Sequence, residues 1–78
     1  MNIDQAIREV EKAFPEGDER YQWRFDSLQR NYGWGWYAIA IQGVWNTEWT
    51  NLRRVVGSGS TPSEALSRLA HKLRTLDE

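Results

Sequence analysis

Aromatic residues are concentrated in the middle of this chain: all five tryptophans, and nine of the ten aromatic side chains, lie between Tyr21 and Trp49. A chain of 78 residues forms one domain, whose core is only just large enough for stability. The central segment must therefore supply much of that core. Its aromatic residues alternate with polar ones, as in Tyr21, Trp23 and Phe25, which is the period of a β-strand. We predict a β-sheet within a single domain, residues 1–78.

Turn signals divide the central segment into three predicted strands. The first covers about residues 21–29, the second covers residues 36–41, and the third lies somewhere within residues 48–56. The turns between them are expected at residues 31–33, Asn-Tyr-Gly, and at residues 45–47, Trp-Asn-Thr. The second strand is apolar on both faces, which is typical of a central strand covered on both sides.

The first segment is predicted to be an amphipathic helix. Asn2 can cap its start, with Gln5 in the position of a capping-box partner, and Pro15 and Gly17 end it. Its apolar stripe, spaced at the helical period, consists of Ile3, Ala6, Ile7, Val10 and Phe14.

The last segment is predicted to be a second helix. Thr61 stands at its N-cap, Pro62 at its first position and Glu64 at its third. Its apolar stripe consists of Leu66, Leu69, Ala70, Leu73 and Leu76. Residues 57–60, Gly-Ser-Gly-Ser, are predicted to be the turn before it. The fold class is therefore α+β in the order α-β-β-β-α, with an antiparallel three-stranded sheet and both helices on one face.

This arrangement leaves one face of the sheet open. We expect the β-branched Ile39 and Ile41 on the helix-covered face and Trp36 on the open face, beside small alanines. Two interpretations of the aromatic surplus stand side by side. In one, the aromatic side chains fold over the open face as a satellite core. In the other, they form an exposed aromatic–arginine patch that binds a partner or a second copy of the chain.

The second interpretation predicts six partner-binding residues, of which the adjacent Arg53 and Arg54 point to opposite faces of their strand. Tryptophan and arginine are the residues most enriched at binding hot spots. The six residues are Trp34, Trp36, Trp45, Trp49, Arg53 and Arg54.

Charge is unevenly distributed along the chain. Residues 1–19 carry a net charge of −4, whereas residues 20–58 hold five arginines against two acids, a net charge of +3. Arg24 and Arg30, with Arg53, Arg54 and the nearby aromatics, can stack on and hold single-stranded RNA or DNA. The net charge of the whole chain is −1, however, while nucleic-acid-binding domains carry a basic excess. We therefore favour a protein partner over nucleic acid.

The sequence contains no catalytic or metal-binding motif. It has no cysteine, and its one histidine, His71, lies on the outer side of the last helix without ligands at metal spacing. The Gly-Trp-Gly of residues 33–35 precedes a strand, so it lacks the helix N-terminus that binds phosphate. We predict no enzymatic activity, no metal and no cofactor. Without a signal peptide or a membrane-spanning apolar run, we expect a cytoplasmic protein that does not contact membranes.

The α-β-β-β-α order, with a glycine-rich stretch leading into the last helix, resembles the double-stranded RNA-binding domain. That family carries lysines at the start of this helix to grip phosphates, where this chain has Thr61, Pro62, Ser63 and Glu64. The resemblance implies the fold, and it makes nucleic-acid binding the alternative function.

A second resemblance involves residues 59–66, Gly-Ser-Thr-Pro-Ser-Glu-Ala-Leu, after a tryptophan-rich sheet. This combination is similar to small accessory proteins of bacteriophages and prophages, anti-CRISPR inhibitors among them. It implies a protein that binds and inhibits a host or defence complex. The function predicted from the sequence is therefore a non-enzymatic protein-binding module, and homodimerisation would cover the same surface.

Overall fold

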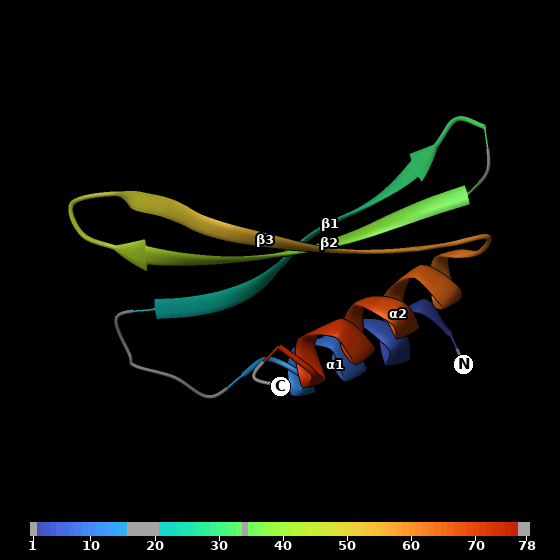
Figure 1. Ribbon diagram of the computed structural model, residues 1–78, viewed down its shortest axis with the longest axis horizontal. Helices are drawn as coiled ribbons and strands as arrows, with labels where there is room; N and C mark the ends of the chain where they lie inside the picture. Colours follow the sequence, from blue (N-terminus) through green and yellow to red (C-terminus); the bar gives the residue numbers. More distant parts are fainter. Residues whose placement is uncertain (1, 16–20, 34, 77–78) are drawn as a thin grey trace.

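The computed structural model describes residues 2–15, 21–33 and 35–76. Its elements are α1 (Ile3–Lys12), β1 (Tyr21–Asn31), β2 (Gly35–Trp45), β3 (Trp49–Gly59) and α2 (Pro62–Arg74). The strands form one antiparallel sheet in the order β1-β2-β3, with β2 in the centre. Figure 1 shows the two helices on the same side of this sheet, beneath one half of its length. The predicted element order and the α+β class are confirmed.

Both helices begin at the predicted caps. The Asn2 side chain accepts a hydrogen bond from the Gln5 backbone N–H at 2.8 Å, and the Gln5 side chain accepts one from the Asn2 N–H at 3.2 Å. At α2, Thr61 Oγ1 accepts from the Glu64 N–H at 3.1 Å, and Pro62 follows the cap. These bonds satisfy N–H groups that the first helical turn leaves without partners. Helix α1 ends at Lys12, before Pro15, while the predicted terminator Gly17 lies outside the described residues.

The strands are longer than predicted, each with 11 residues. The largest difference concerns residues 57–59, which were expected in a turn but are the end of β3, with Gly57 opposite Ala38 and Gly59 opposite Trp36. The glycines allow close approach of α2: a Cβ on Gly57 would stand 2.7 Å from Leu69 Cα. The glycine-rich stretch therefore serves packing between strand and helix.

The predicted orientation of the central strand is wrong. Ala38 and Ala40 face the helices and belong to the buried core, with Trp36 packed against it, whereas Ile39 and Ile41 alternate to the other face. The reason is spatial: α2 lies so close to the sheet that small residues are needed beneath it, and leucines of the helix fill the remaining space. The helical core residues are Ala6, Val10, Ala13, Ala65, Leu66, Leu69, Ala70 and Leu73.

Bulges interrupt both edge strands. In β1 the pairing with β2 skips Asp26, and in β3 it skips Leu52. An extra residue reverses the alternation of faces on either side of it. The bulge at Leu52 therefore accounts for the poor period-two pattern of β3.

The face of the sheet opposite the helices is covered by its own side chains. Ile39 and Ile41 are only 8% and 4% exposed, although no described helix or strand lies over them. Ile41 stands between Arg24 and Arg54 in the register, and Ile39 between Ser27 and Val56. Their burial must come from side chains of the neighbouring strands, so this face does not present the continuous apolar surface that an uncovered sheet would have.

Candidate interaction surface at the β2–β3 end of the sheet

The predicted binding residues separate into two groups. Trp45 and Trp49 are paired across the β2–β3 turn, and Arg53 and Arg54 follow on β3. Trp36 pairs with Gly59 near the opposite end of the sheet and packs against the helix-covered core. Its predicted place in an exposed patch on the open face is therefore wrong, because the parity of β2 turns it toward the helices. Trp34 lies outside the described residues.

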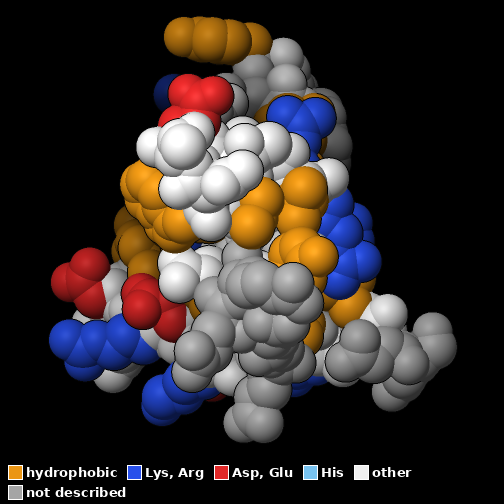
Figure 2. Space-filling model, turned by 90° about the vertical axis from the view of Figure 1, so that its left-hand side faces the viewer, with side chains coloured by type: hydrophobic (Ala, Val, Ile, Leu, Met, Phe, Trp, Pro, Cys, Tyr) orange, Lys and Arg blue, Asp and Glu red, His pale blue; other side chains and the backbone are white. Residues whose placement is uncertain are grey.

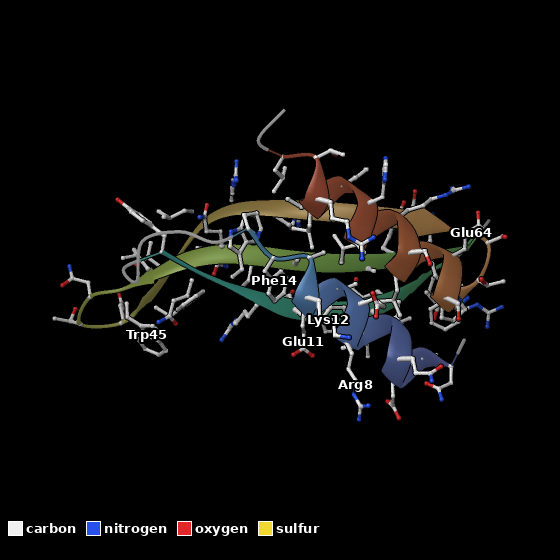
Figure 3. All side chains as sticks on the ribbon, turned by 90° about the horizontal axis from the view of Figure 1, so that it is seen from below. Arg8, Glu11, Lys12, Phe14, Trp45 and Glu64 are labelled. Atoms are coloured by element: carbon white, nitrogen blue, oxygen red, sulfur yellow. The ribbon has the colours of Figure 1, made fainter. Side chains whose placement is uncertain are left out.

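The β2–β3 end of the sheet extends beyond both helices (Figure 1). Seen from below, Trp45 stands at this end, well away from the labelled residues of α1 and α2 (Figure 3). We call this region the hairpin-end surface. Its residues are Tyr21, Trp23, Arg24, Trp45, Trp49, Leu52 and Arg53.

Trp49 is the fixed centre of the hairpin-end surface on the face opposite the helices. Its indole makes an edge contact with Trp45, with ring centroids 5.5 Å apart, and Arg24 Cζ lies 4.8 Å from its centroid. Its Nε1–H donates a hydrogen bond to Asn51 Oδ1. The six-membered ring rests on Gly43, where any Cβ would overlap it. Trp49 is half-buried, with Gly43 beneath its ring and the exposed Trp45 and Arg24 beside it.

A second guanidinium–indole pair lies on the helix side of the same end. Arg53 Cζ is 5.1 Å from the ring centroid of Trp23. The Trp23 ring stacks on Phe14 at 6.2 Å with an interplanar angle of 20°, and both rings pack against the core. Figure 3 shows Phe14 directed from the end of α1 toward the strands. Arg53 is thus held on a ring that is itself fixed by the end of α1.

Exposed apolar side chains gather at the hairpin-end surface. Trp45 is 58% exposed, Leu52 49% and Tyr21 43%; among the described residues only two other large hydrophobic side chains are exposed, Ile3 and Tyr32. Figure 2 looks onto this end of the molecule and shows hydrophobic side chains with both basic and acidic side chains beside them. Apolar groups that cluster in this way mark interaction sites more often than isolated ones do.

Neither the two arginines of the hairpin-end surface nor the neighbouring Arg54 has a carboxylate partner among the described residues. Arg24, Arg53 and Arg54 are exposed, and none forms an ion pair with a described acid. The ion pairs within the described ranges join helix residues instead: Lys12–Glu9, Arg68–Glu64 and Arg74–Glu9. The two regions therefore differ in how charge is paired: the described ion pairs lie on the helices, whereas Arg24, Arg53 and Arg54 form none with a described acid.

A carboxylate of the chain itself, that of Glu64, lies at the start of α2. Glu64 accepts a hydrogen bond from Ser60 Oγ at 2.9 Å and forms an ion pair with Arg68 at 2.6 Å. In a double-stranded RNA-binding domain the corresponding helix start faces phosphate, and a carboxylate there repels it. A hollow of about 370 Å³ nearby is lined by Arg30, Tyr32, Ser60 and adjacent residues, and it carries one basic side chain.

The described residues offer neither a cluster of metal ligands nor a membrane-spanning helix. No group of three or more His, Asp or Glu side chains suited to a metal ion occurs within residues 2–15, 21–33 and 35–76. His71 is exposed on α2. Neither α1 nor α2 combines the length and the hydrophobicity that crossing a membrane requires.

Trp23, Tyr21 and Leu52 were not predicted as members of the hairpin-end surface, and Arg24 was predicted only as a contact for nucleic acid. The period-two pattern placed Trp23 and Arg24 on opposite faces of one strand, but only the register shows that their cation–π partners, Arg53 and Trp49, come from β3.

No protein-family model, curated protein or solved structure matches this chain.

Proposed function

We propose that this protein is a non-enzymatic binding module that docks onto another protein through the hairpin-end surface. The observation that supports it is the convergence, at one end of the sheet, of exposed apolar side chains with two guanidinium–indole pairs. Aromatic and arginine side chains carry most of the free energy of binding at protein interfaces. The same side chains are costly to expose in a small soluble protein unless a partner covers them.

As the kind of partner, we propose a host or defence complex that the protein inhibits, as small phage proteins of the anti-CRISPR type do. This part of the proposal rests on the resemblance of residues 59–66 and of the tryptophan-rich sheet to such proteins. The hairpin end suits an inhibitor because it projects past the helices and can enter a functional site of a larger complex (Figure 1).

Affinity capture from a lysate of the native host tests the proposal, with wild type compared with Trp45→Ala. Because Trp45 is 58% exposed, its truncation leaves the core intact. We expect the affinity of the variant for its partner to fall at least tenfold, since an aromatic hot spot contributes about 2 kcal/mol or more to the free energy of binding. The matched control is Tyr32→Ala, which removes an aromatic side chain that is 94% exposed at the opposite end of the sheet.

The proposal fails if folded Trp45→Ala retains every captured protein. Light scattering of the purified protein separates the homodimer from the foreign partner. A dimer that Trp45→Ala dissociates would assign the hairpin-end surface to a second copy of the chain.

Nucleic-acid binding is the alternative function, and the stacking of Arg24 on Trp49 is the observation that favours it, since such pairs also hold unstacked bases. The carboxylate of Glu64 at the start of α2 argues against the double-stranded mode. Titration with labelled single- and double-stranded oligonucleotides at low salt distinguishes the two functions. Tight binding that weakens steeply with salt would favour nucleic acid.

A further inference from the structure

The two guanidinium–indole pairs of the hairpin-end surface lie on opposite faces of the sheet. Arg24 and Trp49 stand on the face away from the helices, with Arg24 opposite Ile41 in the register. Arg53 stacks on Trp23, whose ring packs against the helix-covered core. An arginine is therefore presented on each side of one projecting end, and Trp45 stands beside the turn at its tip, residues 46–48, which carries the exposed Glu48.

Stacking prepares these arginines for carboxylates. A guanidinium held over an indole loses less conformational entropy when its N–H groups bind a ligand, and those N–H groups match the two oxygens of a carboxylate. Neither Arg24 nor Arg53 meets a carboxylate within the described part of the chain. The complementary ligand is therefore an acidic side chain on each face.

Addition of a fourth strand is a poor alternative at this sheet. Bulges at Asp26 and Leu52 break the regular hydrogen-bonding edge of β1 and of β3. On β3, Lys72 Nζ donates to the Val56 carbonyl at 2.7 Å and an Arg68 guanidinium N–H donates to the Ser58 carbonyl at 3.0 Å. These side chains of α2 occupy backbone acceptors that an added strand needs, so a partner must bind through side chains.

A nucleic acid also fits this arrangement less well. A single strand follows a continuous basic groove on one face of a protein. Here the two stacked arginines are separated by the thickness of the sheet, so one strand cannot follow both. A cleft with two walls, in contrast, contacts both faces at once.

We propose that the hairpin end inserts into a cleft of a partner protein whose two walls carry Asp or Glu side chains. The wall on the side away from the helices binds Arg24 and contacts Trp45, and the other wall binds Arg53. This inference rests on the proposed function and specifies the chemistry of the partner.

Nuclear magnetic resonance titration tests the two-sided recognition of carboxylates. The probe is a short peptide of alternating Glu and Gly, and its Gln–Gly analogue is the uncharged control. We expect the Glu peptide to shift the Arg24 and Arg53 Nε–H resonances and the Trp49 and Trp23 indole resonances. The shifts should saturate and should weaken at about 0.5 M salt, where charges are strongly screened. The Gln peptide should cause none.

Substitutions show whether the two faces act separately. Arg24→Gln should remove the shift at Trp49 and leave that at Trp23, and Arg53→Gln should do the reverse. Each should weaken binding of the Glu peptide by about two- to fivefold, the range of an exposed ion pair. Arg8→Gln is the matched control, because Arg8 projects from α1 away from the sheet (Figure 3), and it should change nothing.

Three results would overturn the inference: no shift at either arginine, equal shifts with the Gln peptide, or tighter binding of an oligo-dT strand than of the Glu peptide. The capture experiment keeps the two proposals distinct. If Trp45→Ala loses a captured partner while the Glu peptide fails to bind, the acidic cleft is wrong and the protein-binding function stands. If Trp45→Ala retains every partner, the function itself is wrong.

Discussion

The helix-covered half of the sheet and its β2–β3 end use similar side chains for different purposes. Beneath α2, the sheet presents Ala38, Ala40 and Gly57, and the large residue Trp36 packs at the margin of the core. At the β2–β3 end, where neither described helix reaches, Trp45 stands in solvent. The difference shows that the position of the helices, and not the residue type, decides which tryptophan serves the core.

The two regions also differ in how arginine is held. On the helices, Arg68 and Arg74 are paired with acids of this chain. At the hairpin end, Arg24 and Arg53 lie on aromatic rings. An arginine over a ring keeps its hydrogen-bond donors available, so the same residue type forms ion pairs on the helices and ring contacts at the hairpin end.

The largest expected contrast between the regions is in the free energy of unfolding when a leucine in each region is replaced by alanine. Leu69→Ala removes a fully buried side chain beneath the sheet and should reduce the free energy of unfolding by about 3 kcal/mol, through lost transfer energy and a cavity. Leu52→Ala, at a bulge where the side chain is 49% exposed, should cost less than about 0.5 kcal/mol. Urea unfolding measures both. Equal losses would show that the hairpin end belongs to the main core.

A smaller effect is expected from Gly43→Ala, which acts on the packing of Trp49 and on the approach of the β3 backbone at Thr50. The new Cβ would overlap the Trp49 ring, so we expect a loss of about 1–2 kcal/mol, typical of overpacking. Part of the loss should disappear in a Trp49→Ala background, because the ring is then absent, and the rest should remain, because the new Cβ would also stand 2.7 Å from the Thr50 backbone oxygen. A double-mutant cycle by urea unfolding, with near-ultraviolet circular dichroism to follow the indoles, tests this coupling. A coupling free energy near zero would mean that Trp49 does not lie on Gly43.

The smallest effect is expected from the stacked arginines themselves. Arg24→Gln should lower stability by about 0.5–1 kcal/mol, as expected of an exposed cation–π contact. Arg54→Gln is the matched control, because no aromatic ring lies under Arg54 in the described residues, and it should change stability less. Thermal unfolding ranks the two variants. An equal loss in both would show that net charge, and not stacking on Trp49, accounts for the effect.

Local chemistry made the elements predictable. The capping pairs Asn2–Gln5 and Thr61–Glu64 depend on residues three apart, and both form as predicted. The glycine-rich stretch before α2 was misassigned to a turn, because glycine occurs both in turns and where a helix packs closely on a strand. Only the position of α2 shows that Gly57 serves the second purpose.

The candidate site was only partly predictable. Trp45, Trp49 and Arg53 were identified from the density of tryptophan and arginine, and the structure brings them to one end of the sheet. Trp36 was misplaced, because the parity of a strand that is apolar on both faces does not show which face the helices cover. The contact between Arg24 and Trp49 joins residues that are far apart in the sequence. It depends on the strand register, which the bulges shift.

The sequence by itself determined the types and order of the elements, their caps and the region where aromatic side chains collect. Periodicity and capping are interactions within a few residues, so they can be read along the chain. The tertiary structure alone decided which face of the sheet is covered, which tryptophans remain exposed and which arginines lie on rings. These features depend on contacts between distant segments, where a close helix selects small residues on one face of β2 and a bulge changes the face that a side chain occupies.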